Sequence, residues 1–447
     1  MRETALLLNP PVPPGVSCLI RDFYCSFSSK AGYYWPPQDL LALSGVLRED
    51  FEIRVIDAVA SKMSPEACRA KVRESGATVM VFSTGSASLA ADMTFVAGLD
   101  KRPGDRWFAS GSLFRGDPGT WKRRYPFLDG VIADFTEPCA LNGSGDERTK
   151  AAGDGEFRLG RPLYERFTGR GGAFPFFGGA PFSILVNSFG CSYRCGFCVA
   201  GTYRIKHRAM SEVVEDVSRL NRRGIRQIFF VDPLFTADPG RVREFCRAVR
   251  GTGTAWVCNA HVDTIQDGTL LEAMRQAGCR ALLIGVESGD EALLKRWGKG
   301  ITIDRIRRAF ALCRRHGIET LAYFMIGLPG EDRASARRTI RFAQELRCDY
   351  ASFDYATPDE GTRLREEALE KGWCGPAGLP EAVDPSRTAV LGTETFSREE
   401  AAALLREAYR SFYLRPGYLL RSLGKIRSLG GMSVLVRAGR ELFRKNI

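Results

Sequence analysis

Three cysteines form the pattern in this sequence that carries the clearest chemistry. Cys191, Cys195 and Cys198 stand at positions i, i+4 and i+7 of one loop. Thiolates at this spacing can bind three irons of a [4Fe–4S] cluster, which leaves the fourth iron open to a substrate or cosubstrate. Three ordinary buried thiols are the alternative, but a loop rich in glycine and aromatic residues is a poor place for core cysteines. A zinc site would need a fourth ligand nearby. The spacing therefore predicts an iron–sulfur site.

The loop directly follows an apolar run, and a regular alternation of strands and helices continues after it. The candidate strands are Ser183–Asn187, Gln227–Val231, Ala255–Asn259, Ala281–Val286, Leu321–Ile326 and Ala351–Tyr355. An amphipathic helical stretch follows each strand, which indicates a parallel sheet with right-handed crossovers. Six such units predict a (βα)6 partial TIM barrel over residues 181–375. The cysteine loop then lies at the carboxyl end of the first strand, where barrels place their chemistry.

A separate α/β pattern precedes this one. Strands are expected at Ala5–Leu8, Ile53–Asp57, Thr78–Ser83, Trp107–Ser110 and Gly130–Ala133, and helices at Asp39–Arg48, Pro65–Ser75 and Leu89–Gly98. This alternation predicts an α/β, Rossmann-like, doubly wound domain over residues 1–140. Residues 141–180 hold ten glycines and little apolar periodicity, so we expect a connecting segment there. We expect residues 376–447 to form a helical, basic C-terminal region.

Composition excludes several classes of protein. Of the 447 residues, 44% are hydrophobic and 26% are charged, which is an ordinary globular mixture. No apolar run reaches about 18 residues, so no transmembrane helix is expected. The N-terminus is too short and too acidic for a signal peptide. Thirteen cysteines indicate a reducing, cytoplasmic location, and three histidines leave no HExxH zinc site.

The net charge of +12 is concentrated near the C-terminus. Residues 401–447 hold ten Lys and Arg against two acidic residues. Because the rest of the chain is nearly balanced, the charge does not indicate nucleic-acid binding. The spacing of Leu414, Tyr418, Leu419 and Leu423 predicts an amphipathic helix pair docked on the barrel, in preference to a surface for RNA or an anionic membrane. We therefore expect neither a nucleic-acid nor a membrane partner.

The cysteine loop is the CxxxCxxC signature of the radical SAM family, with the aromatic residue, Phe197, that this family favours before the last cysteine. Further segments resemble family motifs in the family's order: Phe229–Phe235 on the second strand (with Pro233 in place of the second acid), Gly285–Gly289 as GVESG, Met325–Glu331 as GLPGE, and Pro358 with Gly361 and Thr362 as the closing turn. One such motif would be weak, but five in order at βα spacing are specific.

The resemblance implies a reaction and its cofactors. Radical SAM enzymes bind a [4Fe–4S] cluster and S-adenosylmethionine (SAM), and an electron from an external reductant of flavodoxin or ferredoxin type leads to a 5′-deoxyadenosyl radical. Asp232 and Glu287, at strand ends, can accept hydrogen bonds from the amino or ribose groups of SAM; a structural ion pair is the alternative. The same resemblance assigns Ser288, Gly327 and Phe197 to cofactor binding, with simple turn chemistry as the alternative for Gly327.

A Rossmann-like domain before the barrel resembles the cobalamin-binding subfamily of radical SAM enzymes. The loops where the corrin would lie depart from the family's pattern. Ala109–Arg115 and Ala133–Glu137 are bulkier and more charged than the glycine-rich loops of that subfamily, and the DxHxxG motif is absent. The domain could therefore be a scaffold, and cobalamin binding stays open at this point.

Three residues are candidates for contact with substrate. His261 follows the third strand, where a neutral-pH imidazole could move protons; a structural histidine is the alternative. Tyr203 could project over the cluster as a proton-donating phenol, or pack as an ordinary aromatic ring. Asp354 could anchor a cationic amine, or serve as a structural carboxylate. Asp22, Tyr24 and Tyr33 belong to a loop that could cover the site.

We expect a radical SAM enzyme acting on a small molecule, and two reactions compete. The first is hydrogen abstraction from a polyhydroxylated natural product, an aminosugar or aminoglycoside, followed by radical dehydration: a lyase of antibiotic biosynthesis. The second is cobalamin-dependent methylation of an unactivated carbon in natural-product biosynthesis. A third hypothesis, from a different class, is a non-catalytic iron–sulfur or nucleic-acid-binding protein. Salt-dependent RNA binding without SAM cleavage would favour it.

Overall fold

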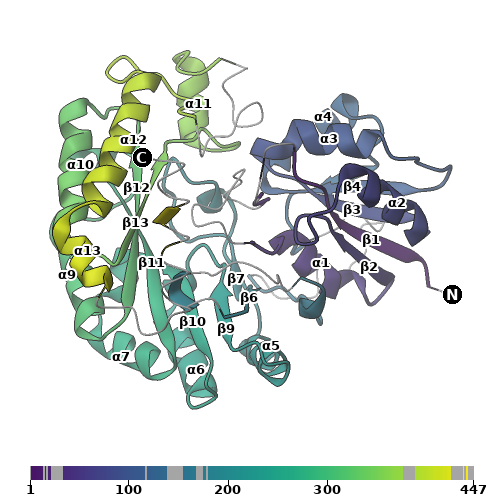
Figure 1. Ribbon diagram of the computed structural model, residues 1–447, viewed down its shortest axis with the longest axis horizontal. Coiled ribbons are helices and arrows are strands. Elements are labelled where there is room, and N and C mark those ends of the chain that lie inside the picture. The colour runs from purple at the N-terminus through teal and green to yellow at the C-terminus, as the bar shows by residue number, and fades with distance from the viewer. Residues whose placement is uncertain are drawn as a thin grey trace. The chain divides into compact units, whose positions relative to one another are not determined.

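The computed structural model describes residues 2–13, 16, 19–21, 34–115, 118–137, 155–167, 175–177, 180–375, 388–423, 436 and 439–440. Asp22, Tyr24 and Tyr33, much of the predicted connecting segment and part of the tail lie outside these residues. The chain divides into two compact units (Figure 1). The first comprises the described residues up to 167 with Lys206–Ala209, and the second comprises the others.

The first unit is built on a five-stranded parallel sheet in the order β2-β1-β3-β4-β5. Its strands are β1 (Thr4–Asn9), β2 (Glu52–Asp57), β3 (Val79–Ser83), β4 (Arg106–Ser110) and β5 (Gly130–Ile132). β8 (Lys206–His207) also belongs to this unit. The order reverses between β1 and β3, which makes their carboxyl ends the switch point where such sheets bind ligands. The Rossmann-like prediction is confirmed.

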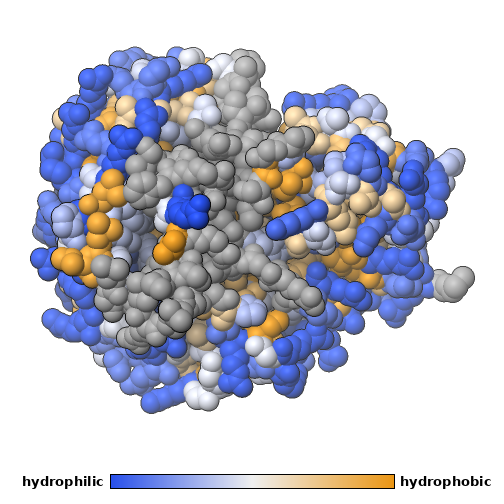
Figure 2. Space-filling model, in the orientation of Figure 1, coloured by the Kyte–Doolittle hydropathy of each residue, from blue (hydrophilic) through white to orange (hydrophobic). Residues whose placement is uncertain are grey.

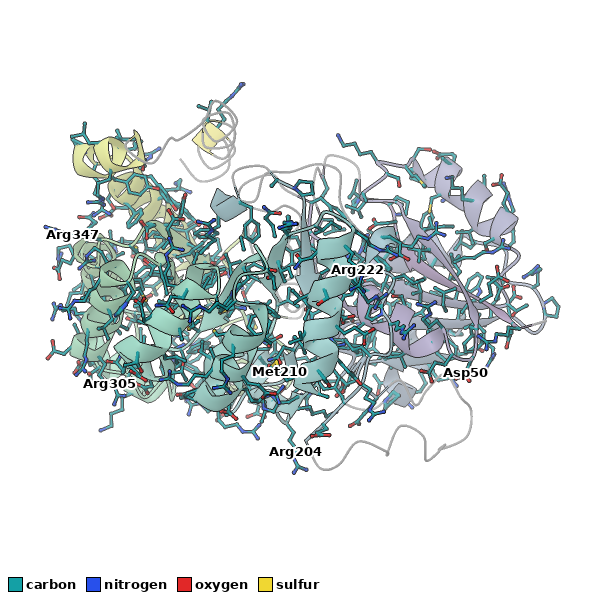
Figure 3. All side chains as sticks on the ribbon, turned by 90° about the horizontal axis from the view of Figure 1, so that it is seen from below. Asp50, Arg204, Met210, Arg222, Arg305 and Arg347 are labelled. Atoms are coloured by element: carbon teal, nitrogen blue, oxygen red, sulfur yellow. The ribbon has the colours of Figure 1, made fainter. Side chains whose placement is uncertain are left out.

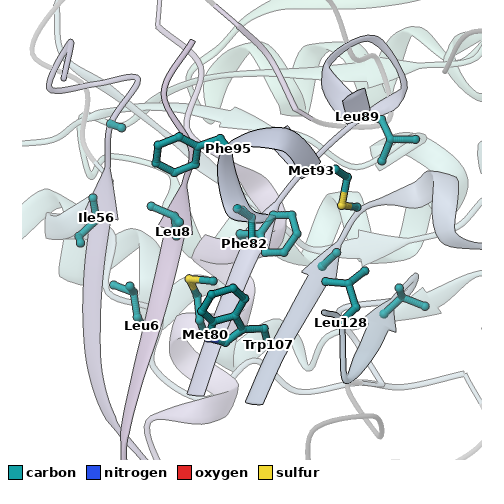
Figure 4. Packing of buried hydrophobic residues seen from close by; sticks show 14 of the residues in the cluster. Leu6, Leu8, Ile56, Met80, Phe82, Leu89, Met93, Phe95, Trp107 and Leu128 are labelled. Atoms are coloured by element: carbon teal, nitrogen blue, oxygen red, sulfur yellow. The ribbon is translucent and has the colours of Figure 1, made fainter. Parts of the chain in front are cut away.

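Helices cover both faces of this sheet. They are α1 (Gln38–Leu47), α2 (Pro65–Ser75), α3 (Leu89–Ala97) and α4 (Pro118–Arg124), with short 3-10 turns η1 (Ser86–Ser88), η2 (Ser112–Phe114) and η5 (Tyr164–Arg166). Because strand side chains alternate between faces, Leu6 and Leu8 enter the core beside α2 and α3, where Met80, Phe82 and Trp107 also pack (Figure 4). α1 packs against β1 and β3 from the other face.

Residues 155–167 of the predicted connecting segment pack on α1. Phe157, Leu159 and Tyr164 are buried there. A Cβ on Gly45 would lie 2.0 Å from the carbonyl oxygen of Leu159, so only glycine lets this backbone cross the helix so closely. The buried side of α1 therefore depends on this segment.

The second unit is built on a six-stranded sheet in the order β13-β12-β11-β10-β9-β6, in which all neighbours are parallel. The strands of this sheet are β6 (Phe182–Leu185), β9 (Gln227–Phe230), β10 (Ala255–Ala260), β11 (Cys279–Glu287), β12 (Glu319–Ile326) and β13 (Tyr350–Tyr355). The short strand β7 (Ser188–Phe189) lies in this unit but outside the sheet. β6 and β13 are the two edges, so the barrel is partial, as the sequence predicts.

Helices follow the strands of the second unit on the outer face. They are α5 (Met210–Arg222, both ends labelled in Figure 3), α6 (Pro239–Val249), α7 (Gly268–Gln276), α8 (Glu291–Arg296), α9 (Ile303–Arg315), α10 (Arg333–Glu345), α11 (Arg363–Glu370), α12 (Arg398–Tyr413) and α13 (Pro416–Leu423). The short 3-10 turns are η6 (Pro175–Phe177), η7 (Val199–Thr202), η8 (Phe235–Ala237) and η9 (Val262–Ile265). Side chains of β12 alternate: Ala322, Phe324 and Ile326 are buried towards the helices, while Tyr323 and Met325 are half-buried on the inner face.

The C-terminal helices cover the β13 edge. Tyr409 of α12 packs edge-to-face on Phe353, and the ring of Tyr418 packs on Phe412. The prediction that the apolar face of the tail docks on the barrel is wrong for Leu414 and Leu419, which are 41% and 47% exposed. The short α13 contacts α12 through Tyr418, whereas Leu419 and Leu420 face outward, and apolar residues are visible over α13 (Figure 2). Among the described residues, no helix has both the length and the apolar character to cross a membrane.

Candidate active site

The cysteine loop begins where β7 ends. Gly190 has φ +77°, and a Cβ there would lie 2.3 Å from the carbonyl oxygen of Arg204, so the turn into the loop requires glycine. The amide of Cys198 donates to the carbonyl of Cys195 at 3.0 Å. Cys191, Cys195 and Cys198 are partly exposed, whereas the other described cysteines are buried. The three predicted ligands are thus the accessible thiols of the described chain.

The thiols also lie close enough to affect one another. Burial raises the pKa of all three, to about 12 for Cys198, and the charge of Cys195 raises the pKa of Cys198 further. Joint ionisation therefore needs a cation, which iron supplies. Nowhere in the described chain do three His, Cys, Asp or Glu side chains converge on a single ion. Cluster ligands need not converge, because each thiol binds a different iron. The donor set fits a [4Fe–4S] cluster.

Asp232, just after β9, fixes the approach to this loop. Its carboxylate is fully buried and accepts hydrogen bonds from the amide and side chain of Asn187, at 2.7 and 2.9 Å, and from the Ser188 hydroxyl at 3.0 Å. Burial raises the pKa of Asp232, and these hydrogen bonds oppose that rise. The contacts of this carboxylate connect the second strand of the barrel to the residues just before the cysteines.

A later segment holds the loop from another side. The Gly196 amide donates to the carbonyl of Trp297 at 2.9 Å, and the amide of Leu364 donates to the carbonyl of Gly196 at 2.9 Å. The indole of Trp297 in turn donates to the carbonyl of Pro329, within the Met325–Glu331 motif. Three segments far apart in the sequence therefore meet at the residue after Cys195.

Glu287 ends β11 and forms a buried ion pair, the alternative considered for it above, with a partner that the sequence did not reveal. Its Oε1 lies 2.9 Å from Nζ of Lys299, and both side chains are about one-tenth exposed. Glu287 has φ +67°, a left-handed conformation that costs a non-glycine residue roughly 1–2 kcal/mol. The nearest signal in the sequence is that Lys299 stands between two glycines, Gly298 and Gly300.

The next predicted cofactor residues form turns. Gly327 has φ +87°, and its amide donates to Oε2 of Glu331 at 2.6 Å. Burial raises the pKa of Glu331 to about 8. The Ser288 hydroxyl shares a hydrogen bond with Thr339 and accepts one from the amide of Asp290, so it fixes the start of α8. The sequence motif contains Glu331 but does not reveal its hydrogen bond to the amide of Gly327.

His261 meets the cysteine loop. Its ring stacks on Tyr193 with centroids 3.8 Å apart, and its Nδ1 accepts from the amide of Asp263 at 3.3 Å. Burial lowers the pKa of His261 to about 3, and the charges of Lys299 and Arg305, on α9 (Figure 3), add to this effect. His261 is therefore a neutral imidazole near pH 7.

The other predicted site residues are Tyr203, Phe197 and Asp354. Tyr203 is buried with its ring edge-to-face on Phe189 at 4.9 Å, and Phe197 is buried inside the loop. Asp354 lies opposite Met325 and accepts from the Ser352 hydroxyl at 3.0 Å. Because Phe353 faces α12, Asp354 projects from the inner face of the sheet. The site thus gathers the cysteine loop, His261 and the Glu287–Lys299 pair, with Asp354 on a neighbouring strand of the inner face.

The comparisons with known proteins agree with this geometry. Residues 186–343, from the end of β6 into α10, match the model of the radical SAM superfamily. The chain is 28% identical over 450 residues to an uncharacterized methyltransferase of Pyrococcus horikoshii, with 94% of each chain covered. It is 27% identical over 253 residues to cytidylyl-2-hydroxyethylphosphonate methyltransferase of Streptomyces wedmorensis, covering 54% of this chain and 47% of that one.

Solved structures share the fold over both units. The radical S-adenosylmethionine methyltransferase TsrM from Kitasatospora setae has a TM-score of 0.64 at 14% identity, covering 99% of this chain and 100% of that one. The cobalamin-dependent radical enzyme OxsB has a TM-score of 0.58 at 15% identity, covering 99% and 72%. At these identities the likeness concerns the fold. With the cysteine loop, the superfamily match over residues 186–343 makes the barrel of this chain similar to radical SAM enzymes, whose cofactors are a [4Fe–4S] cluster and SAM.

Proposed function

We propose that this protein is a cobalamin-dependent radical SAM methyltransferase that acts on a small molecule. The observation that carries the proposal is the alignment of the whole chain, both units included, with a relative named as a methyltransferase. The fold shared with TsrM over 99% of the chain is consistent with it. This assignment reverses the order that the sequence suggested, where dehydration came first.

The first unit contains groups that suit a bound corrin. At the carboxyl end of β3, beside the switch point, Ser83 and Thr84 are each 1% exposed, and among the described residues neither hydroxyl has a hydrogen-bond partner. A buried hydroxyl without a partner costs about 1–3 kcal/mol, which a ligand supplying that partner removes. A Cβ on Gly111 would lie 2.4 Å from the carbonyl oxygen of Thr84, so the β4 loop passes close to this end. These residues fit cobalamin.

The neighbouring strand ends are already satisfied. Arg21 is 3% exposed and donates to both carboxylate oxygens of Asp92, at 2.8 and 2.6 Å, and to the side chain of Asn9. Asn9 also donates to Asp57, which accepts from the hydroxyl of Tyr34. None of the three histidines of the chain follows a strand of this sheet. We therefore expect cobalamin to bind without a histidine from these loops.

In the barrel, the residues of this chain would bind and position the reactants. Cys191, Cys195 and Cys198 would each ligate one iron, while Asp232 holds the residues before them. When bound, the cluster supplies the electron that cleaves SAM, and cobalamin carries the methyl group. Tyr193, within the loop, and His261 stack on each other and would help to exclude water from the site, and His261 stays neutral. Glu287, Ser288, Gly327 and Phe197 are proposed contacts of SAM; Asp354 and Tyr203 are proposed contacts of substrate.

Radical dehydration of an aminosugar remains the second candidate. Asp354 on the inner face of β13 favours it, because a carboxylate there suits a cationic amine. The more specific resemblance to the paromamine dehydratase of apramycin biosynthesis finds no support among the relatives described above, which are named as methyltransferases.

The two reactions leave different products of SAM. After anaerobic cluster reconstitution, the protein is given SAM, a flavodoxin- or ferredoxin-type reductant and candidate aminosugars, with and without hydroxocobalamin. The proposal predicts corrin absorbance in stoichiometric amount and S-adenosylhomocysteine only when cobalamin is present. Deoxyadenosine alone, in equal amount with and without cobalamin, would support dehydration and contradict the proposal.

A further inference from the structure

Lys299 is a buried cation beside the cysteine loop that the proposed reaction does not use. It is 7% exposed, and its Nζ lies 2.9 Å from Glu287. Burial alone would lower the pKa of this lysine, but the charge of Glu287 and then that of Cys195 more than offset burial, so the pKa of Lys299 is raised. A lysine is almost never this buried unless it is paired, and Glu287 is the partner here. What this buried pair does beside the cysteine loop needs an explanation.

The backbone around Lys299 is shaped to hold it in place. Gly298 and Gly300, with φ +70° and +68°, let the chain turn on both sides of the lysine. On β11, a Cβ at Gly285 would lie 2.7 Å from Nζ of Lys299 and 2.3 Å from Oε1 of Glu287. The ion pair therefore lies directly on the backbone of Gly285, in space that only glycine leaves open.

The segment that carries Lys299 lies against the cysteine loop. A Cβ on Gly298, the residue before Lys299, would lie 3.5 Å from the carbonyl oxygen of Arg194, the residue before Cys195. The hydrogen bond from Gly196 to Trp297 ties the segment just before Lys299 to the loop. A buried charge is screened far less by water and salt than an exposed one, so this cation would act more strongly than a surface charge on a cluster bound by the loop.

We propose that Lys299, held by Glu287, is the fixed counter-charge that sets the reduction potential of the cluster bound by Cys191, Cys195 and Cys198. A [4Fe–4S] cluster with three thiolates is an anion, and reduction adds one further negative charge. A cation fixed in a region of low dielectric constant therefore favours the reduced cluster. This role rests on the proposed function only in that the protein must bind the cluster. It does not depend on which group the enzyme transfers. Lys299 is a positioning residue in this account, because it acts through the cluster.

The test is a redox titration of the full-length, reconstituted protein without SAM, followed by electron paramagnetic resonance. Lys299→Met should make reduction at least tenfold less favourable, which is a negative shift of about 59 mV for a one-electron couple. Glu287→Gln leaves the cation uncompensated and should shift the potential in the positive direction. Lys299→Arg keeps the charge and should stay near the wild-type potential. Lys295→Met is the matched control, because Lys295 is exposed on α8.

Shifts of opposite sign in Lys299→Met and Glu287→Gln support the proposal, since a purely structural role does not predict them. Potentials equal to wild type, or shifted in the same direction in both variants, overturn it. Where Lys299→Met fails to retain a cluster, the sign in Glu287→Gln decides. A wild-type protein that binds no iron after reconstitution would instead refute the proposed function, so the iron content separates the two failures.

Discussion

Two tyrosine hydroxyls replace the strand that β13 lacks at its outer edge. The Tyr409 hydroxyl donates to the carbonyl of Phe353 at 3.0 Å and accepts from the amide of the same residue at 3.1 Å. Tyr413, one helical turn later, makes the same pair of bonds to Ala351 at 2.7 and 3.1 Å. An open sheet edge invites pairing with another chain, so α12 both closes the half-barrel and protects it.

Tyr409→Phe keeps the ring, which is fully buried against Phe353, and removes only the hydroxyl. Each buried backbone group that loses its partner costs about 1–3 kcal/mol, so we expect a loss of about 2–6 kcal/mol for the two groups. A loss of 2 kcal/mol raises the opening equilibrium about thirtyfold. Tyr413→Phe should have a comparable effect at Ala351.

Hydrogen–deuterium exchange of the peptide covering β13 measures this opening directly, even if the two units unfold separately. Tyr125→Phe is the control, because among the described residues the hydroxyl of Tyr125 forms no hydrogen bond. Unchanged protection of β13 in both α12 variants, or an equal loss in the control, would refute the reasoning.

Three further predictions follow from buried charges and from the cysteines. The pKa of Glu331 is raised from its ordinary value of 4.5 to about 8. Between these pH values the folded state keeps a proton that the unfolded state has lost. The free energy of unfolding must therefore fall as the pH rises from 4.5 to about 8. In urea unfolding, Glu331→Gln should remove this fall and be more stable at pH 8 by on the order of a few kcal/mol; an unchanged pH profile would contradict it. Arg21→Met leaves Asp92 buried without its cation and should cost about 3–5 kcal/mol in thermal unfolding of the first unit, and a loss below about 1 kcal/mol would show that the pair is dispensable. Cys195→Ala should take up much less iron and sulfide on reconstitution. Cys246→Ala, at a buried thiol on α6, is the control and should bind as much iron and sulfide as the wild type. Equal iron and sulfide in the two variants would argue against the cluster.

The fold could be predicted because several of its strands, such as β3 and β6, are buried along their whole length. Such strands appear as continuous apolar runs, and capped helices lie between them: the predicted helix Pro65–Ser75 is α2, which Ser64 caps and which ends at Gly76 in the left-handed conformation. α4 was not predicted, because none of its side chains is buried and it has no apolar periodicity. The outward-facing Leu414 and Leu419 show that apolar spacing alone does not decide whether a face is covered.

The site could be predicted only where its residues are close in the sequence. The cysteine loop and the Met325–Glu331 motif are local patterns, so spacing alone identifies them. Lys299 is a lysine between two glycines, which resembles an exposed turn, and only the close passage of β11 at Gly285 makes it a buried cation. The role of Asp232 in fixing Asn187 depends likewise on a contact across 45 residues of sequence.

The central claim is cobalamin-dependent methyl transfer by a radical SAM enzyme. The most direct measurement is mass spectrometry of the SAM products formed by the anaerobic, cluster-loaded protein with reductant, in the presence and absence of hydroxocobalamin. The account predicts S-adenosylhomocysteine that depends on cobalamin. Deoxyadenosine alone, formed equally without cobalamin, would contradict methyl transfer, and neither product from a protein with an intact cluster would contradict the radical SAM assignment itself.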